Sequence, residues 1–369
     1  MQKKHVAVID IGSSKMTSFI GEKGVNKTFV VKGFKEVEYS GYLSGEFLEL
    51  DETISVLKQM VDNIKVSGND IKKVFVGVPG GFTRNLVRES QLAFTKKRKI
   101  TEKEINALYD GGLKEDITGY TVINRSPILF ELDDFRKTPD AFGELSATLK
   151  GRVSYVLCKD YFIKTVRETL DKNGISDIEF VSVPLAEALY LIDPQSRDRL
   201  AVLIDTGYIS STFTIIQGDG ILYQRSFDNG GGLITSALSR YYDIEFEIAE
   251  KLKRKATISV NATETDSYEI VHGDRGLYFN KNEVKKVILD ALDNLSQDID
   301  DCIRNSRLEL PEYVPLLITG GGIAYLRGAN ERLSTRLNAV VETVVPSVPL
   351  FDKPNNSSYL SVLNLALEQ

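Results

Sequence analysis

The chain has 369 residues, 42% of them hydrophobic and 27% charged, which is enough for two domains or for one large duplicated domain. A net charge of −6 argues against a broad nucleic-acid surface. With two cysteines and two histidines, the chain favours reduced thiols over a disulfide framework and leaves little room for a histidine-based metal site or triad. No apolar run reaches the roughly 18 residues of a membrane span, so we expect a cytoplasmic globular protein.

Two segments share one layout: a buried strand ends in Asp, a tight turn follows, and a second strand returns. The first is HVAVIDIGSSKMTSFIGEKG (5–24) and the second is LAVLIDTGYISSTFTIIQGDG (200–220). The apolar runs before Asp10 and Asp205 are typical of buried strands, and the glycines after them are typical of turns. The repeat predicts a duplicated architecture.

The segments between the two hairpins predict an α/β unit with an insertion. Helical spacing marks 51–68, and KKVFVGVPGGF (72–82) indicates a strand that ends at a Pro-Gly-Gly breaker. From about 82 to 158, strand-like runs surround one helix that starts at Thr101, where Glu104 completes a capping box. This stretch predicts a small inserted α+β subdomain.

After the second hairpin, a glycine-rich turn leads into two helices (GGGLITSALSRYYDIEFEIAEKLKRKA, 230–256). A long amphipathic helix is predicted over 283–307, where apolar residues fall on one face. VPLLITGGGIAYLRGANERLSTRL (314–337) predicts a strand, a glycine turn and a helix. The acidic residues of the long helix lack EF-hand spacing, so they predict a solvated face rather than a metal site.

Three turns that follow buried strands make sense together as one nucleotide site: 10–15, 205–208 and 319–322. Backbone N–H groups in two such hairpins can bind phosphates as anion nests. The carboxylates of Asp10 and Asp205 can hold Mg²⁺ through waters. The triple glycine Gly320, Gly321 and Gly322 allows the backbone to approach a purine and its sugar.

The order of these motifs resembles that of the actin-like ATPase superfamily, which includes sugar kinases, heat-shock chaperones and bacterial actins. Residues 6–21 look like its first phosphate motif, 201–216 like its second, and 316–328 like its adenosine motif. AEKLKR (249–254) matches a Glu-x-x-Lys pair, so Glu250 and Lys253 are expected near the ribose and adenine, although a surface salt bridge is the competing interpretation. The resemblance implies ATP and Mg²⁺ as ligands. It implies a nucleotide-binding set of Gly12, Ser13, Ser14, Lys15, Gly207, Tyr208, Gly231, Glu250, Lys253, Gly320, Gly321 and Gly322, with Asp10 and Asp205 as metal-binding and catalytic carboxylates.

Within that superfamily the chain resembles the bacterial cell-division protein FtsA over almost its whole length. DIGSSKM matches the first FtsA motif, the segment from 40 to 82 follows the N-terminal FtsA pattern, and RKITEKEINAL resembles the helix start of the inserted FtsA subdomain. The resemblance implies an actin-like (ribonuclease H-like) α/β fold with two lobes. The expected first lobe comprises 1–81, 159–195 and 345–369, with the insert at 82–158. The second lobe is expected at 196–254 and 310–344, with an outer subdomain at 255–309.

Two departures from the superfamily pattern predict weak or absent hydrolysis. The second phosphate motif has Tyr208 and Ile209 where glycines are usual, and we expect Tyr208 to restrict the γ-phosphate space. Val183 stands before Pro184 where hydrolysing relatives carry a Glu or Gln that orients water. Glu187 lies three residues beyond this proline; it is a catalytic candidate, but an exposed helical carboxylate is the favoured interpretation.

The FtsA resemblance implies self-association into filaments or dimers and binding of the FtsZ tail, with recruitment to the inner face of the cell membrane. FtsA usually ends in a linker and a membrane helix, whereas this sequence ends on what resembles the last core helix. KKRK (96–99) is expected to be a solvated hairpin turn, with a lipid-headgroup patch as the alternative. A PilM-like cytoplasmic adaptor of type IV pilus or secretion assembly, which binds a membrane protein's tail, remains the main alternative function. A metabolic kinase fits less well because the insert lies in the wrong place.

Overall fold

The computed structural model describes residues 5–24, 29–67, 71, 73–115, 117–273 and 275–368. The chain divides into two compact units. One unit comprises Met1–Val202, Thr214–Arg225 and Ser358–Gln369, and the other comprises Leu203–Phe213 and Ser226–Ser357. The finer division into lobes and subdomains stays a prediction.

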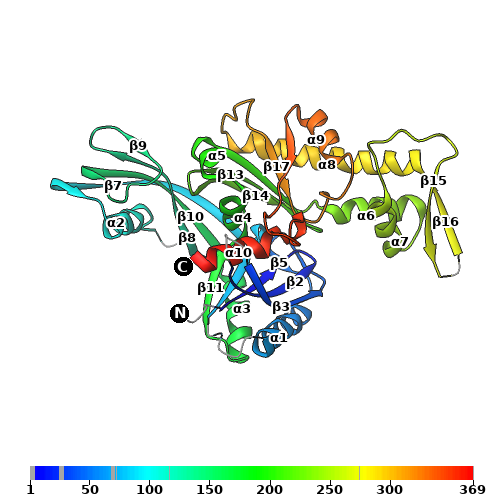
Figure 1. The fold of residues 1–369 in the computed structure, drawn as a ribbon, viewed down its shortest axis with the longest axis horizontal. Coiled ribbons are helices and arrows are strands. Elements are labelled where there is room, and N and C mark those ends of the chain that lie inside the picture. Colours follow the sequence, from blue (N-terminus) through cyan, green and yellow to red (C-terminus); the bar gives the residue numbers. More distant parts are fainter. Residues whose placement is uncertain are drawn as a thin grey trace. The chain divides into compact units, whose positions relative to one another are not determined.

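The first unit is built on a five-stranded sheet with the order β11-β6-β1-β2-β3 (Figure 1). In that order its strands span Asp177–Ser182, Lys73–Val78, His5–Ile11, Lys15–Lys23 and Phe29–Glu38. β1 pairs antiparallel with β2 and parallel with β6. The predicted N-terminal hairpin is therefore the centre of a mixed sheet.

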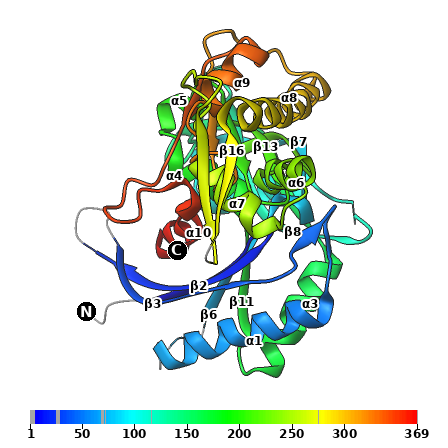
Figure 2. The ribbon, with the colours of Figure 1, turned by 90° about the vertical axis from the view of Figure 1, so that its right-hand side faces the viewer.

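Helices cover both faces of this sheet, with α1 (Leu50–Ser67) and α3 (Asp160–Lys172) on one side and α10 (Ser357–Glu368) on the other (Figure 2). Successive side chains of β2 reach opposite layers. Phe19 stacks on Tyr359 of α10 with 5.1 Å between ring centroids, while Ile20 belongs to the hydrophobic cluster that includes α1. Because both faces are covered, β1 and β2 are buried along most of their length, and β1 is apolar except at His5 and Asp10.

The insert forms a separate antiparallel sheet with the order β7-β10-β8-β9. These strands span Thr83–Lys99, Leu145–Lys159, Tyr120–Leu132 and Lys137–Thr138. α2 (Glu102–Gly112) packs on this sheet, where Gly151 leaves room for Leu108. The backbone N–H of Thr101 donates to the Glu104 carboxylate over 3.0 Å, which confirms the predicted capping box.

The expectation of a hairpin turn at 96–99 is wrong. These residues form the end of β7, where Lys99 pairs with Leu145 and Arg98 pairs with Ser146. The basic run escaped prediction as strand because consecutive lysines and arginines have little strand propensity.

A third sheet has the order β14-β13-β12-β17-β18. These strands span Gly220–Phe227, Ser211–Gln217, Ala201–Thr206, Leu316–Thr319 and Val341–Thr343. β12 lies between its hairpin partner β13 and the later strand β17, just as β1 lies between β2 and β6. The shared strand order confirms the predicted duplication.

The second unit carries most of the remaining helices. α6, α7, α8 and α9 span Gly231–Tyr242, Phe246–Lys255, Lys281–Ser306 and Ala329–Leu337. α8 confirms the predicted amphipathic helix, because it buries a stripe that includes Val284, Ile288, Leu295 and Ile299. A two-stranded ribbon consists of β15 (Ser267–His272) and β16 (Arg275–Asn280).

The other elements are short. They are β4 (Tyr42–Leu43), β5 (Glu46–Phe47), α4 (Val183–Leu191), α5 (Pro194–Arg199) and two 3₁₀ turns, Gly80–Phe82 and Pro354–Asn356. Among the helices that the structure describes, none combines the length and apolar character that a membrane span requires.

Candidate functional site

The turn between β1 and β2 is held by its own backbone and by one tyrosine. The Gly12 N–H donates to the Lys15 carbonyl over 2.9 Å. The Tyr39 hydroxyl donates to the Gly12 carbonyl over 2.8 Å, and the Tyr39 N–H donates to the Ser14 carbonyl over 3.1 Å. Ser13 is buried in the same turn. The geometry of this turn is therefore fixed by the protein alone.

Asp10 ends β1 as a buried carboxylate, with 6% of the residue exposed. Its Oδ1 lies so close to Gly77 of β6 that a Cβ on that glycine would be only 2.9 Å away. Ser358 of α10 donates to Oδ2 over 2.5 Å. Burial raises the pKa of Asp10 from 3.8 to about 6, and the Ser358 hydrogen bond opposes that rise only in part. A carboxylate in this setting gains from a bound cation, because the cation offsets the cost of burying its charge.

The side chain of Lys15 lies along β3, and its expected contact with phosphate stays a prediction. Its ammonium group is 2.6 Å from Glu36 and 3.8 Å from Glu38. Because the Lys15 side chain is 41% exposed, these ion pairs are weak and leave the side chain able to change partner.

The expectation that Glu187 is an exposed helical carboxylate is wrong. Glu187 lies in α4 with 1% of the residue exposed. α4 begins with Val183, which is 4% exposed and packs beside Gly77, and its amino end is capped by Ser182. The first six residues of the helix are buried because its sequence, VPLAEALYL, is apolar almost all round, and Glu187 is buried with them.

In the second unit, three glycine-containing segments pack backbone against backbone. The Gly322 N–H donates to the Thr206 carbonyl over 2.7 Å, and the Gly231 N–H donates to the Gly207 carbonyl over 3.0 Å. The Gly232 N–H also donates to the Tyr208 carbonyl over 2.7 Å. These bonds join the turn after β12, the start of α6 and the turn after β17 into one layered surface, which we call the glycine cradle (206–208, 230–232 and 320–322).

The glycine cradle has no room for side chains at its contacts. A Cβ on Gly231 would lie 2.2 Å from the Gly322 carbonyl oxygen, and a Cβ on Gly322 would lie 2.2 Å from that of Gly207. Gly320 has φ of +90°, and a Cβ there would lie 2.2 Å from Oδ1 of Asp205. Gly321 differs, because its nearest neighbour would be Asn355 at 3.1 Å. Gly321 is therefore the least crowded position of the triple glycine.

Tyr208 lies over α7. Its hydroxyl donates to Oε2 of Glu250 over 3.1 Å, and the ammonium of Lys253 is 5.0 Å from its ring centroid. The ring also packs edge-on against Phe246, with 6.4 Å between centroids. The expectation that Tyr208 restricts the γ-phosphate space stays untested, but the ring has a defined place against α7 that the sequence did not suggest.

Gly207, Tyr208 and Ile209 do not adopt positive φ. The bulky residues of the second phosphate motif are thus compatible with this backbone without strain.

Glu250 and Lys253 form a largely buried ion pair with an N–O distance of 2.8 Å. Lys253 also donates to the Gly231 carbonyl over 2.9 Å, which ties α7 to the glycine cradle. Oε2 of Glu250 accepts from Thr235 over 2.5 Å, and Oε1 accepts from Arg254 over 2.8 Å. The pair is a salt bridge, as the competing interpretation expected, but it is largely buried rather than on the surface. Its expected place near the ribose and adenine stays a prediction.

This network sets the charge of Glu250. Burial alone would raise the pKa of Glu250, but the charge and hydrogen bond of Lys253, with the bonds from Thr235 and Arg254, lower it from 4.5 to about 2. Burial lowers the pKa of Lys253, and the Glu250 charge limits that change. Burial and the nearby Glu250 charge raise the pKa of Tyr208 to about 12. At neutral pH the site therefore contains an ionised Glu250 and a neutral Tyr208.

The comparisons with known proteins agree with this architecture. The chain is 22% identical to cell division protein FtsA of Streptococcus pneumoniae serotype 2, over 92% of this chain and 75% of that protein. It is 23% identical to FtsA of Staphylococcus epidermidis strain ATCC 12228, over 100% of this chain and 80% of that protein. A family model described as type IV pilus assembly protein PilM matches residues 166–265.

Solved structures show the same fold. The structure of a PilM-PilN type IV pilus biogenesis complex matches with a TM-score of 0.64 and 16% identity, over 99% of both chains. An MreB protein of Spiroplasma citri bound to AMPPNP matches with a TM-score of 0.58 and 12% identity, over 100% of this chain and 97% of that one. The chain has the actin-like fold, and its sequence resembles FtsA.

The FtsA-like sequence motifs converge within the second unit. Asp205, Gly207, Tyr208, Gly231, Glu250, Lys253 and the triple glycine all lie at or beside the glycine cradle. In the first unit, Asp10, Gly12, Ser13, Ser14 and Lys15 lie along one hairpin. Among the described residues, no group of three or more His, Cys, Asp or Glu could hold a metal ion.

Sequence reasoning missed three residues that position these groups: Ser358, Tyr39 and Thr235. Ser358 is 348 residues from Asp10, and no motif connects them. Tyr39 and Thr235 look like ordinary strand-end and helix residues in the sequence. Only the folded chain shows that one supports the Gly12 turn and the other bonds Glu250.

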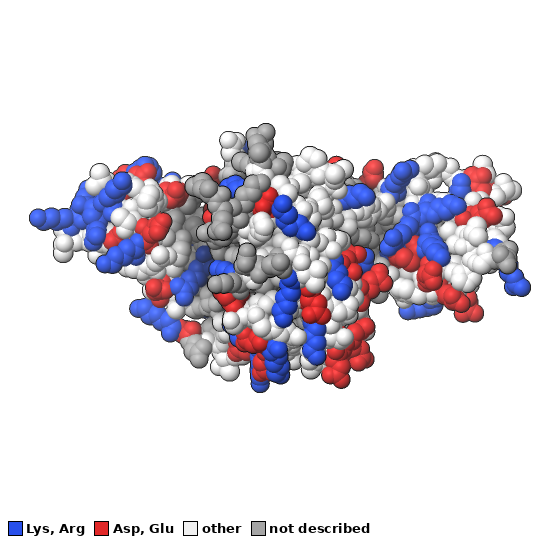
Figure 3. Space-filling view, turned by 60° about the horizontal axis from the view of Figure 1, so that its bottom comes forward, with Lys and Arg blue, Asp and Glu red and all other residues white. Residues whose placement is uncertain are grey.

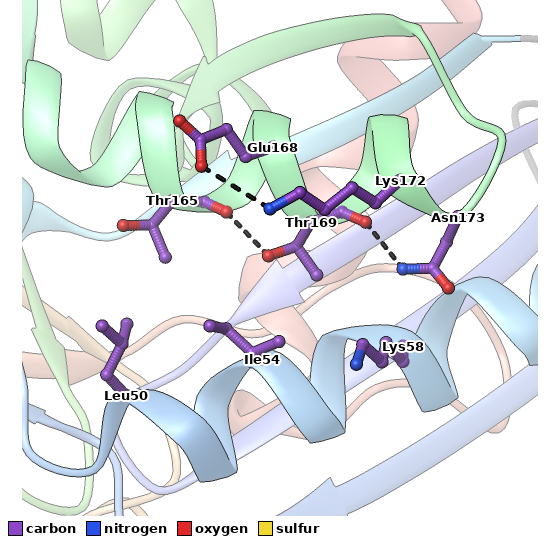
Figure 4. Close-up of a pocket in the computed structure, with 8 residues that line it drawn as sticks. All are labelled: Leu50, Ile54, Lys58, Thr165, Glu168, Thr169, Lys172 and Asn173. Atoms are coloured by element: carbon purple, nitrogen blue, oxygen red, sulfur yellow. Dashed lines mark hydrogen bonds and ion pairs between the residues drawn. The ribbon is translucent and has the colours of Figure 1, made fainter.

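A hollow in the first unit contains none of the predicted site residues. It has a volume of about 250 Å³ and lies between α1 and α3 (Figure 4). Its polar groups mostly bond within α3: the Thr169 hydroxyl donates to the Thr165 carbonyl over 2.8 Å, and Asn173 donates to the Thr169 carbonyl over 2.8 Å. We assign no ligand to this hollow.

Proposed function

We propose that the protein is an ATP-binding, actin-like adaptor of bacterial cell division. One observation carries the nucleotide part: Asp10 and Asp205 end equivalent strands, and each packs directly on a glycine, Gly77 or Gly320, of the neighbouring strand or its end. A carboxylate that only caps a turn does not need to contact a glycine of the neighbouring strand. The same contact at both aspartates therefore favours a shared function over two turn caps. The overall resemblance to FtsA supports the adaptor role.

In this proposal the glycine cradle binds the adenosine part of ATP. Gly321, the least crowded position of the triple glycine, has no side chain to keep the ligand from the backbone. Glu250 and Lys253 hold α7 on the cradle and offer charged hydrogen-bond partners to the ribose and base. The backbone N–H groups of the turns after Asp10 and Asp205 would contact phosphates. Bound Mg²⁺ would neutralise phosphate charge, with Asp10 and Asp205 as water-mediated ligands.

A calorimetric titration with Mg·ATP tests nucleotide binding. We expect saturable binding to the wild-type protein and its loss in the Asp205→Asn and Asp10→Asn variants. Asp171→Asn, which removes one exposed carboxylate from α3, is the matched control and should bind as the wild type does. Absence of binding to the wild-type protein at millimolar ATP would refute the proposal.

We further propose that hydrolysis is slow or absent. Val183 occupies the position where a water-orienting Glu or Gln is expected, and it is an apolar, buried side chain. Phosphoryl transfer depends on positioning of the attacking group. A Val183→Gln variant should therefore release phosphate from ATP faster than the wild type. Steady phosphate release by the wild-type protein at rates typical of enzymes, about 1 s⁻¹ or more, would contradict this.

For partners, we propose self-association and binding of the FtsZ tail. The specific alternative is a PilM-like adaptor that binds a membrane protein's cytoplasmic tail. Two observations favour the PilM-like alternative: the PilM family model matches 166–265, and the PilM-PilN complex shares the fold over 99% of both chains. Parallel pull-downs with an FtsZ C-terminal peptide and with the N-terminal peptide of a pilus membrane protein separate the two. Nucleotide-dependent pelleting would add support for the FtsA-like role.

A further inference from the structure

The outer end of the insert's sheet carries a set of exposed side chains that the proposed function does not use. β7 and β10 lose register near this end. Arg98 of β7 pairs with Ser146 of β10, and the next pair along the strands is Ala93 with Thr148. Four residues of β7, 94–97, thus face a single residue of β10. This bulge displaces the residues before the end of the strand from the ladder. All of 95–99 are exposed.

Three lysines at this end have no acidic partner. Other basic residues there are paired: Lys97 lies 3.0 Å from Asp133, Arg98 lies 3.0 Å from Glu104, and Arg136 lies 2.6 Å from Glu144. By contrast Lys96, Lys99 and Lys137 are exposed and form no ion pair with any residue that the structure describes. Their charges are available to a ligand.

Large apolar side chains are exposed beside these lysines. Phe135 is 82% exposed, Phe142 is 57% exposed and Leu145 is 66% exposed. Leu145 stands opposite Lys99 in the ladder. A Cβ on Gly143 would lie 3.6 Å from the Lys99 side chain. The aliphatic part of Lys99 therefore lies alongside the segment that joins Phe142 to Leu145.

The Arg136–Glu144 ion pair connects the turn that carries Phe135 to that same segment. These segments meet at the outer end of the sheet, and we call six of their exposed side chains the tip patch: Lys96, Lys99, Phe135, Lys137, Phe142 and Leu145. In Figure 3 Lys and Arg side chains gather at the left, where the end of β7 lies in Figure 1.

We propose that the tip patch binds the surface of an anionic lipid bilayer. Lysine ammonium groups attract anionic headgroups, and exposed aromatic and aliphatic side chains enter the interfacial layer beneath them. The lysines are flexible point charges without a fixed hydrogen-bond geometry, which suits a fluid array of headgroups better than one shaped protein site. Because the whole chain has a net charge of −6, the rest of its surface is repelled by such a bilayer, and this end approaches first.

Vesicle flotation of the full chain, without nucleotide, tests this proposal. We expect the protein to float with vesicles that contain phosphatidylglycerol and to stay in solution with vesicles of phosphatidylcholine alone. Binding should weaken as salt is raised, because the headgroup attraction is screened. Equal binding to both kinds of vesicle, or no binding to either, would overturn the proposal.

Two variants locate the contact. Lys96→Ala/Lys99→Ala/Lys137→Ala should lower the partition coefficient about 100-fold, since each lysine near an anionic surface contributes about fivefold. Phe135→Ser/Phe142→Ser should also lower it while leaving the salt dependence intact. The control Lys58→Ala/Lys164→Ala/Lys172→Ala removes three exposed lysines from α1 and α3 and should bind as the wild type does.

Equal losses in the control and in the tip variant would show nonspecific attraction and refute the tip patch. If the tip variants keep vesicle binding but lose self-association in analytical ultracentrifugation, the patch is a subunit contact instead. All substituted side chains are exposed, so unchanged circular dichroism is expected and would confirm that the variants are folded.

Discussion

The hydroxyl of Tyr208 donates to the Glu250 carboxylate over 3.1 Å, which connects the turn after β12 to α7. Glu250 also accepts from Lys253, Thr235 and Arg254. A Tyr208→Phe variant therefore removes one of four donors and keeps the ring against Phe246. We expect a loss in unfolding free energy of about 1 kcal/mol or less, measured by urea unfolding.

Replacing both bulky residues has a different expected result. Tyr208→Gly/Ile209→Gly restores the glycines of the superfamily motif and frees space beside the glycine cradle. We expect tighter Mg·ATP binding by calorimetry than in the wild type, whereas Tyr208→Phe should bind like the wild type. If the glycine variant binds no more tightly and turns over no faster, these side chains do not shape the nucleotide site.

Lys253→Met should destabilise the protein by about 3 kcal/mol, because it leaves the largely buried Glu250 carboxylate without its nearest charge and removes the bond to Gly231. Lys251→Met is the matched control on the same helix; it breaks only the exposed ion pair with Glu247 and should cost about 0.5 kcal/mol or less. Equal losses in the two variants, measured by urea unfolding at pH 7, would contradict the structural role of Lys253.

The same network predicts acid sensitivity. The pKa of Glu250 is about 2 in the folded protein, against 4.5 for the unfolded chain. A depressed carboxyl pKa stabilises the fold above the unfolded value, and that stabilisation is lost as the pH falls from about 4.5 toward about 2. Glu250→Gln should therefore flatten the loss of stability over that range. A pH series of urea unfolding curves that is equally steep for both proteins would count against this assignment.

The pKa of Asp10 is shifted in the opposite direction from that of Glu250. Its pKa is raised from 3.8 to about 6, so the folded protein binds this proton more tightly than the unfolded chain, and its stability falls as the pH rises from 3.8 through about 6. Asp10→Asn should then increase the unfolding free energy by up to about 3 kcal/mol at pH 8, with the gain fading toward pH 4. The variant should be more stable than the wild type and yet bind no Mg·ATP. A destabilised variant at pH 8 would show that the carboxylate is stabilised in a way that its burial does not indicate.

Gly322→Ala and Gly321→Ala form a matched pair. The first would place a Cβ 2.2 Å from the Gly207 carbonyl oxygen, whereas the second meets only Asn355 at 3.1 Å. Overpacking of backbone contacts should cost Gly322→Ala about 3 kcal/mol, while Gly321→Ala, which needs only a small shift of the Asn355 side chain, should lose less stability in thermal unfolding. If ATP contacts the backbone at Gly321, the Gly321→Ala variant should still lose affinity for ATP. Similar stability losses in both variants would contradict the packing described for the glycine cradle.

The sequence predicted correctly those elements that depend on residues close together in the chain. Apolar runs that end in Asp10 and Asp205 predicted the two hairpins, and the Thr101–Glu104 spacing predicted the start of α2. The apolar stripe of α8 predicted a helix that the structure bears out. Such features follow from periodicity and capping, which act over a few residues.

Long-range packing was beyond those signals. The burial of Glu187 was mispredicted because a lone carboxylate in a helix suggests a side that faces water, whereas the residues around it in α4 are apolar and buried. The basic run of 96–99 was mispredicted as a turn because pairing with β10 outweighs its poor strand propensity.

By itself, the sequence determined the duplicated α/β architecture, the likeness to FtsA and the turns that follow Asp10 and Asp205, because these depend on residue order along the chain. Tertiary structure decided which groups meet: Ser358 with Asp10, Tyr208 with Glu250, and Lys253 with the Gly231 carbonyl. It also decided that Asp10 is buried and Lys96 is not. The physical reason is that burial and charge pairing are set by residues far apart in the chain, so no local pattern contains them.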